Sequence, residues 1–272
     1  MSAIPNVLTI AGSDSGGGAG IQADLKAMSA RGVYGCSVIT ALTAQNTRGV
    51  ADIHAVPPAF VRAQLDAVLG DIEIAAVKIG MLGAADVVVA VADGLAAHGV
   101  RRVVLDPVMV AKSGDRLLRE DAVAALRDRL LPRAEIITPN LPEAADLLGR
   151  PEPRTREEML DAARALAALG PAGVLLKGGH LPAADESPDL LVDGGDVTWL
   201  EGHRVATQRT HGTGCTLSSA LAAELAWGAP ALEAVRAAKA YLTRAIAHAD
   251  ALGVGRGHGP VHHFHALWPP RP

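Results

Sequence analysis

Residues 209–225 combine a glycine-rich turn, a helical pattern and a cysteine. Gly212 and Gly214 allow a tight backbone turn. The leucines that follow have the spacing of one helix face, at Leu217, Leu221 and Leu225. The N–H groups of a helix start bind anions, phosphate above all, and Cys215 lies where the helix dipole would favour its thiolate. These residues predict a phosphoryl-transfer site.

Side chains able to bind a ligand stand directly after several apolar segments of strand type. They are Gln45, Met81, Asp106, Asn140 and Lys177. Parallel α/β sheets bind ligands at the carboxyl ends of their strands. If the sheet is parallel, all five lie on one edge, and this coincidence is a stronger signal than any single residue.

Asp106, together with Asn140 and Glu143, could hold Mg²⁺ mostly through waters, as expected beside nucleotide phosphates. Asn140 and Glu143 also have the spacing of a helix capping box, and a helix start that faces the site can serve both purposes. Lys177 could reach a nucleotide phosphate, or it could be a strand-end lysine in solvent. Lys239 lies in a predicted helix at 230–252, where a solvated face is the alternative to a functional role.

The glycine-rich segment 12–20 follows a strand predicted at 7–11. It fits neither the dinucleotide-binding fingerprint nor the P-loop, so we do not assign it to ATP. A flexible turn is one interpretation, and the number of glycines favours the other, close backbone approach to a small substrate.

Histidines occur near the candidate site and in the tail of the chain. We interpret His180 and His211 as hydrogen-bonding loop residues rather than general bases. The tail histidines resemble a metal cluster, but no cysteine or carboxylate completes a ligand spacing, so we predict no metal at His262, His263 and His265.

Strand and helix patterns alternate along the chain, which is typical of an α/β fold. Apolar runs predict strands at 7–11, 33–43, 75–79, 102–106, 134–138 and 173–177, and a Gly-Gly turn within 190–201 predicts an antiparallel hairpin at the sheet edge. Such continuous apolar strands indicate a parallel sheet covered by helices on both faces. Because no linker divides the chain, we expect a single domain over residues 1–272.

The composition excludes several classes of protein. The chain is 49% hydrophobic and 3% aromatic, so aliphatic residues must fill a large core. A net charge of −4 argues against a nucleic-acid or polybasic membrane surface. The sequence shows no signal-peptide pattern, no apolar run long enough to span a membrane and no cysteine spacing typical of disulfides. We therefore expect a soluble cytoplasmic protein with two reduced thiols.

Nine segments, in order along nearly the whole chain, resemble the bacterial hydroxymethylpyrimidine/phosphomethylpyrimidine kinases of the ribokinase-like superfamily. They are TIAGSD (9–14), GGAGIQADLK (17–26), GVYG (32–35), SVITALTAQNT (37–47), KIGML (78–82), DPVMV (106–110), TPNLPE (138–143), KGGH (177–180) and HGTGCT (211–216). No single segment is specific, but together they are.

The resemblance implies a three-layer α/β/α fold with a mostly parallel central sheet. It implies ATP- and Mg²⁺-dependent phosphorylation of 4-amino-5-hydroxymethyl-2-methylpyrimidine to its monophosphate and then its diphosphate, in thiamine biosynthesis, and it suggests a homodimer. It places an anion hole and catalytic group at Gly212, Thr213, Gly214 and Cys215, and a pyrimidine pocket at Gly12, Asp24, Gln45, Met81 and Val108. The nucleotide positions are Asn140, Lys177 and Lys239, and the metal positions are Asp106 and Glu143.

Other functions remain open at the level of the sequence. Related sugar kinases carry Asp where this chain has Cys215, and a thiol base needs a lowered pKa, which the helix start can supply. Some pyridoxal kinases share the thiol, so a pyridoxal kinase is the nearest alternative. A non-catalytic phosphometabolite sensor is an alternative of another class, and the failed dinucleotide fingerprint disfavours a nicotinamide-dependent reductase.

Overall fold

The computed structural model describes residues 3–109, 120–179, 181 and 186–268. Within them, one sheet has the strand order β3-β2-β1-β4-β5-β6-β7-β8-β9. Its strands are β1 (Asn6–Asp14), β2 (Tyr34–Asn46), β3 (Gly49–Ala55), β4 (Ala76–Ile79), β5 (Val103–Leu105), β6 (Ile136–Ile137), β7 (Gly173–Lys177), β8 (Asp189–Asp193) and β9 (Asp196–Leu200).

The middle of the sheet is parallel, as predicted. β1 pairs with β2 and β4, and β5, β6 and β7 follow in the same direction. β3 lies antiparallel to β2 at one edge. The predicted hairpin is β8 and β9 at the other edge, with Gly194 and Gly195 at positive φ in its turn.

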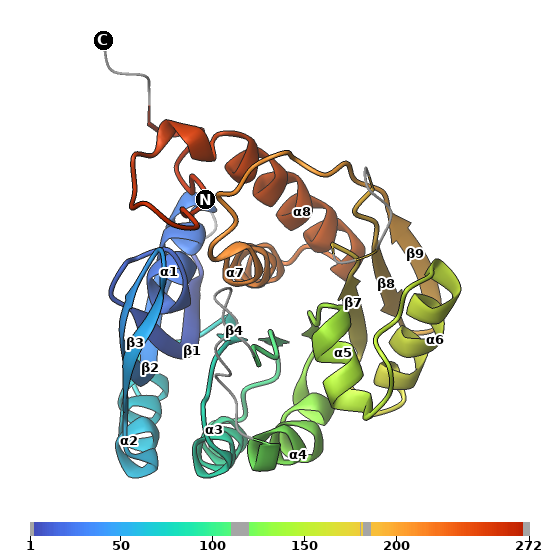
Figure 1. Ribbon diagram of the computed structural model, residues 1–272. Helices are drawn as coiled ribbons and strands as arrows, with labels where there is room; N and C mark the ends of the chain where they lie inside the picture. Colours follow the sequence, from blue (N-terminus) through green and yellow to red (C-terminus); the bar gives the residue numbers. More distant parts are fainter. Residues whose placement is uncertain (1–2, 110–119, 180, 182–185, 269–272) are drawn as a thin grey trace.

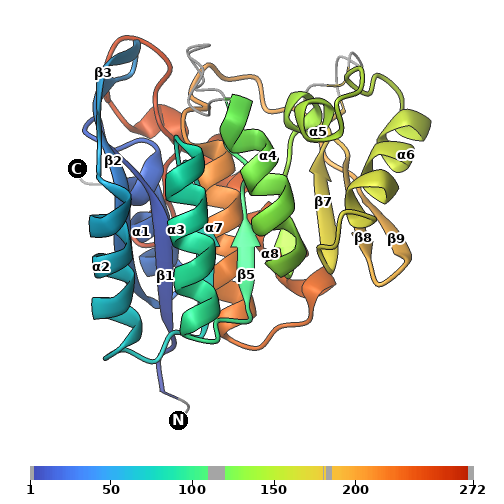
Figure 2. The same ribbon diagram turned by 90° about the horizontal axis from the view of Figure 1, so that it is seen from below.

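Helices cover both faces of the sheet, which confirms the expected three layers. In Figure 1 the curved sheet encloses α7, with α1 and α8 beside it. Figure 2 shows α2, α3 and α4 on the opposite face. The helices are α1 (Gly20–Ala30), α2 (Pro58–Leu69), α3 (Ala85–Ala97), α4 (Glu120–Arg129), α5 (Leu141–Leu148), α6 (Arg156–Ala167), α7 (Thr213–Ala226) and α8 (Ala231–Ala247).

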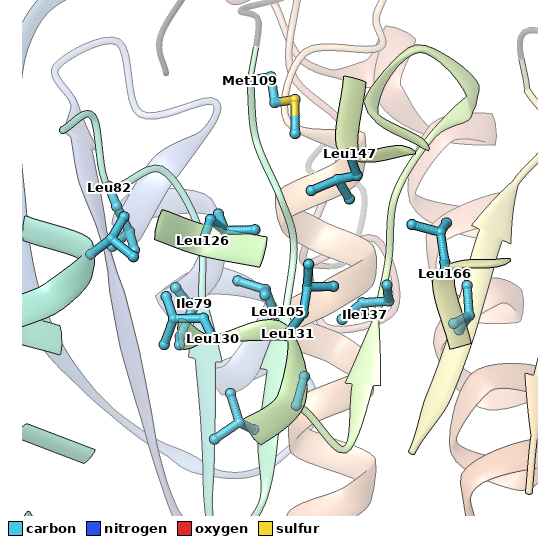
Figure 3. Packing of buried hydrophobic residues seen from close by; sticks show 14 of the residues in the cluster. Ile79, Leu82, Leu105, Met109, Leu126, Leu130, Leu131, Ile137, Leu147 and Leu166 are labelled. Carbon is cyan, nitrogen blue, oxygen red and sulfur yellow. The ribbon is translucent and has the colours of Figure 1, made fainter. Parts of the chain in front are cut away.

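Strand side chains alternate between two aliphatic cores because successive residues of a strand point to opposite faces. Val104 packs with α1, α7 and α8. Its neighbour Leu105 packs on the other face with Ile79 and Leu126, as Figure 3 shows. The sheet is therefore buried on both sides and holds its strand ends rigidly.

Three element boundaries differ from the predictions. β1 continues to Asp14 and β2 to Asn46, because each strand keeps its pairing partner past the apolar run. The last long helix ends at Ala247, before the predicted end near residue 252. A short 3₁₀ helix follows at Ala249–Ala251, and Arg209 donates to the side chain of Asp250 within it and to the carbonyl of Leu252 directly after it. Among the described residues, no helix is both long and apolar enough to cross a membrane.

Candidate active site

The predicted strand-end residues do gather at one edge of the sheet. Parallel pairing places the carboxyl ends of β4, β5, β6 and β7 side by side. Asn140, which follows β6, forms a parallel bridge with Lys177 at the end of β7. α7 begins at the same edge, so the site lies between a helix start and a row of strand ends.

The start of α7 has the predicted turn. Gly212 is its N-cap, with φ of 78°, and no side chain in the described part of the structure caps the helix. The Thr213 N–H donates to the Thr210 carbonyl at 3.4 Å, and the N–H groups of Gly214 and Cys215 that follow it are the ones that could bind an anion. A Cβ on Gly212 would collide with the carbonyl oxygen of Gly18, so this approach requires glycine. Thr216 donates its hydroxyl to the Gly212 carbonyl at 2.7 Å, which fixes the turn that Thr213 follows.

Cys215 keeps part of its surface exposed at this helix start. Burial raises the pKa of the thiol to about 11, although the Lys78 ammonium acts in the other direction. The carboxylates of Asp24 and Asp106 raise the pKa further. The expectation of a lowered pKa is therefore wrong for the ligand-free protein, because desolvation and two nearby carboxylates outweigh the favourable contacts.

Asp106, Lys177 and Glu143 form a carboxylate–lysine cluster facing α7. The Lys177 ammonium lies 3.0 Å from Asp106 Oδ1 and 4.0 Å from Glu143 Oε2. Burial would lower the pKa of Lys177, but Asp106 and Glu143 raise it, so the lysine stays charged. The alternative of a lysine in solvent is wrong. Thr138 donates to Asp106 at 2.9 Å and fixes that carboxylate.

The predicted capping box of α5 is confirmed. Asn140 Oδ1 accepts from the Glu143 backbone N–H, and Glu143 Oε2 accepts from that of Asn140, both at 2.8 Å. Burial raises the pKa of Glu143 to about 7, and Lys177 opposes that shift. The same carboxylate thus caps the helix and faces the cluster.

Asp106 and Glu143 are oxygen donors of the kind that Mg²⁺ prefers. Among the described residues, no group of three His, Cys, Asp or Glu side chains could hold a metal ion. Two carboxylates fit a Mg²⁺ ion that takes its remaining ligands from nucleotide phosphates and water.

Only some of the residues predicted to line the pyrimidine pocket are accessible to a ligand. The Met81 methyl packs so closely on Gly12 that a Cβ there would collide with it. Gln45 accepts from the Thr43 hydroxyl at 3.0 Å, which orients its amide. Val108 and Met81 are half-buried and can contact a ligand.

Asp24 differs from the other predicted pocket residues because it is fully buried. Its carboxylate binds the Lys78 ammonium at 2.8 and 2.9 Å and accepts hydrogen bonds from the hydroxyls of Thr9 and Ser219. Asp24 therefore lies beneath the site surface, where its carboxylate and the Lys78 ammonium shift the pKa of Cys215 in opposite directions. Lys78 is not among the predicted site residues, although a lysine inside the apolar run 75–79 is a better functional candidate than a surface lysine.

Lys239 is paired rather than solvated, so its predicted alternative is wrong. Its ammonium binds Asp189 Oδ2 at 2.6 Å and the Ser187 carbonyl at 3.2 Å. Asp189 in turn accepts from the N–H of Gly178, the residue after Lys177. Lys239 thus supports the segment that follows Lys177.

The histidines of the tail pack within the protein. His263 is buried and its Nε2 lies 3.0 Å from the Thr216 hydroxyl of α7. His262 and His265 lie against the rings of Trp268 and His248. His211 hydrogen-bonds Asp14, which confirms its interpretation as a hydrogen-bonding loop residue. His180 lies outside the described residues.

A parallel sheet, an uncapped helix start and a facing carboxylate–lysine cluster define a small-molecule kinase of the ribokinase-like fold. The family model described as phosphomethylpyrimidine kinase matches residues 14–262, and the chain belongs to that family. The hydroxymethylpyrimidine/phosphomethylpyrimidine kinase of Salmonella typhimurium is 58% identical over 267 residues, which are 97% of this chain and 98% of that protein.

Two solved structures are similar along most of the chain. The ADP complex of Bacillus subtilis pyridoxal kinase has a TM-score of 0.89 and 38% identity, covering 97% of this chain and 99% of that one. The phosphomethylpyrimidine kinase of Clostridium difficile has a TM-score of 0.79 and 43% identity, and the match covers 89% of this chain and 99% of that one.

Proposed function

We propose that this protein phosphorylates 4-amino-5-hydroxymethyl-2-methylpyrimidine and then the resulting monophosphate, with MgATP as the phosphoryl donor. One observation carries the proposal. A Cβ on Gly214 would lie 3.2 Å from Asp106 Oδ2 and 3.5 Å from the Lys177 ammonium. The carboxylate–lysine cluster therefore abuts the helix start. This is required if the cluster holds the nucleotide phosphates while the helix start binds the phosphoryl group that is transferred to the alcohol.

The residues divide the work of phosphoryl transfer. Lys177 would hold the nucleotide phosphates, with Asn140 and Lys239 supporting that side. Asp106 and Glu143 would hold Mg²⁺, which supplies neutralisation of phosphate charge when bound. The N–H groups of the helix start would stabilise charge on the transferring group.

We assign the alcohol substrate to a pocket beside the glycine-rich loop 12–20. Gln45 has an amide that can donate to and accept from a pyrimidine edge. Gly12, Met81 and Val108 supply the walls of this pocket. Cys215 would accept the alcohol proton only in its thiolate form, and because a thiol of pKa about 11 is protonated at neutral pH, only a small fraction of the ligand-free protein carries that form.

A comparison of three alcohols tests the proposal. Initial rates with the hydroxymethylpyrimidine, its monophosphate and pyridoxal are measured with and without Mg²⁺. We expect both pyrimidines to be phosphorylated in preference to pyridoxal, and only with Mg²⁺. Pyridoxal is the competing substrate because of the 38% identical Bacillus subtilis pyridoxal kinase. A preference for pyridoxal, or no ADP release with any alcohol, would refute the proposal.

The pathway fits a cytoplasmic enzyme, and the resemblance suggests a homodimer. Light scattering of the purified protein measures its mass in solution. A mass of twice 27.9 kDa is the expected result, and the monomer mass would contradict it.

A further inference from the structure

Asp14 organises the glycine-rich loop from its buried position at the end of β1. Its Oδ1 accepts from the N–H of Gly16 at 2.8 Å. Its Oδ2 accepts from the N–H groups of Gly18 and Ala19 at 3.0 and 2.8 Å. One carboxylate with only 2% of its surface exposed thus fixes the path of the whole loop.

His211 connects this carboxylate to the anion hole. Its Nε2 lies 2.9 Å from Asp14 Oδ2, and its backbone N–H donates to the Gly259 carbonyl at 3.1 Å. The next residue is Gly212, the N-cap of α7. The loop and the helix start also touch directly, because a Cβ on Gly212 would collide with the Gly18 carbonyl. A hydrogen-bonded pair therefore spans the joint between two parts of the site.

We propose that the Asp14–His211 pair is a positioning device, which sets the distance between the glycine-rich loop on the alcohol side and the anion hole at the start of α7. The inference rests on the proposed function, because it assigns the loop to the alcohol. Neither side chain touches the reacting atoms. Each acts by fixing backbone that does.

The pair belongs to one half of the site only. Asp106 follows β5, Lys177 ends β7 and Glu143 lies in α5, and within the described part of the chain no hydrogen bond or ion pair joins this cluster to Asp14 or His211. Loss of the pair should therefore move the alcohol relative to the phosphoryl group and leave the nucleotide in place. Misplacement of a reacting group by about 1 Å can cost about 100-fold in rate.

Substitution of either partner tests the pair. In Asp14→Asn, the amide cannot accept at both oxygen positions, so one loop N–H or the His211 bond is lost. His211→Leu removes the bond, whereas the side-chain amide of His211→Gln can still donate to Asp14. We expect kcat/KM for the pyrimidine alcohol to fall about 30- to 100-fold in Asp14→Asn and His211→Leu, and His211→Gln to recover most of the loss.

A second route perturbs the pair without removing it. A Cβ on Gly18 would collide with the His211 ring, so Gly18→Ala should displace the ring and lower kcat/KM in the same way. Asp250→Ala is the matched control, because it removes an exposed ion pair with Arg209 two residues away from His211. That control should keep wild-type kinetics.

The nucleotide affinity separates positioning from general damage. We expect the Kd for MgATP, titrated without alcohol, to stay within about twofold of wild type in every variant, including those in which kcat/KM falls. If Asp14→Asn, His211→Leu and Gly18→Ala keep kcat/KM within threefold, or if His211→Gln is no better than His211→Leu, the positioning role is wrong. A large loss of MgATP affinity would also overturn it. Wild-type protein that fails to phosphorylate the pyrimidine refutes the proposed function instead.

Discussion

Cys215 shows how much a residue's role depends on its surroundings. The helix start favours a thiolate, yet burial and two carboxylates raise the thiol pKa to about 11. At pH 8 only about one thiol in a thousand is then ionised. The thiol can therefore assist proton removal only weakly in the ligand-free protein.

This ionisation predicts the chemistry of Cys215 directly. The rate of alkylation by iodoacetamide should rise about tenfold per pH unit between pH 8 and pH 10, without a plateau, because the thiolate fraction rises in that way. Mass spectrometry separates Cys215 from the buried Cys36. A plateau below pH 8 would show a lowered pKa. In turnover, Cys215→Ala should lose about 10- to 100-fold in kcat, and full activity would exclude any part in proton removal.

Glu143 predicts a pH dependence of nucleotide binding. Its pKa is raised from 4.5 to about 7 mainly by burial, so the ligand-free protein takes up a proton there as the pH falls below 7. Mg²⁺ needs the ionised carboxylate. MgATP affinity should therefore fall up to about tenfold per pH unit below pH 7. Calorimetry in two buffers of different ionisation enthalpy should detect proton release on binding. Glu143→Gln should remove that release, and an unchanged release would contradict the assignment.

At this scale the sequence predicted which residue types stand at strand ends but not how they pair. Asp106, Asn140 and Lys177 could be placed on one edge, since a parallel sheet aligns strand ends. The bond between Asp24 and Lys78 joins residues 54 apart in sequence, and no local pattern encodes it. Likewise, the sequence offered helix-dipole reasoning for Cys215, while its desolvation depends on tertiary packing.

The element that decides the site is the turn into α7. Gly212 has φ of 78° and lies against the Gly18 carbonyl, so it meets two constraints at once. Gly228, at the other end of the same helix, has φ of 88° but nothing within 4 Å of a Cβ placed there. Both glycines have a positive φ, but only Gly212 also lies against another backbone carbonyl.

Gly212→Ala and Gly228→Ala therefore form a matched pair. Gly228→Ala should cost about 1–2 kcal/mol of stability from the left-handed backbone alone, and leave kcat unchanged. Gly212→Ala should cost more, and should reduce kcat/KM by about 100-fold or more as the anion hole is displaced. Urea unfolding and steady-state kinetics measure both effects. Equal losses in the two variants would show that contact with Gly18 has no role.

Element types were predictable along most of the chain, whereas their ends were less so. The alternating apolar runs and helix patterns gave every strand and helix that builds the site. The end of α8 was predicted at Leu252 from the following glycine, but the α-helix ends at Ala247 and a short 3₁₀ helix follows, where Arg209 bonds Asp250 and Leu252. Helix ends depend on such bonds from distant segments, which periodicity cannot reveal.

On the scale of the whole molecule, the tail of the chain supports the start of α7. Gly259 accepts from the His211 backbone, and His263 lies 3.0 Å from the Thr216 hydroxyl. Thr216 in turn bonds the Gly212 carbonyl. The tail thus packs against the start of α7. The sequence predicted no such contact, because the tail histidines suggested only a possible metal cluster.

This arrangement predicts how stability depends on pH. Burial lowers the pKa of His263 from 6.5 to about 3, so the unfolded chain binds a proton between these values that the folded protein excludes. The stability contribution is complete above pH 6.5 and is lost as the pH falls toward 3. The slope approaches about 1.4 kcal/mol per pH unit well below pH 6.5.

Comparison with His263→Gln isolates this contribution, because glutamine is neutral throughout and can still bond Thr216. Urea unfolding between pH 7.5 and pH 4.5 should show wild type losing up to about 1.4 kcal/mol per pH unit more than the variant at the acid end. Near pH 7.5 the variant should be the less stable of the two, since it fills the buried site less well. Its curve should therefore approach or cross that of wild type as the pH falls. Parallel curves would mean that His263 can be protonated in place, and that the tail is not closed against α7 by a neutral imidazole.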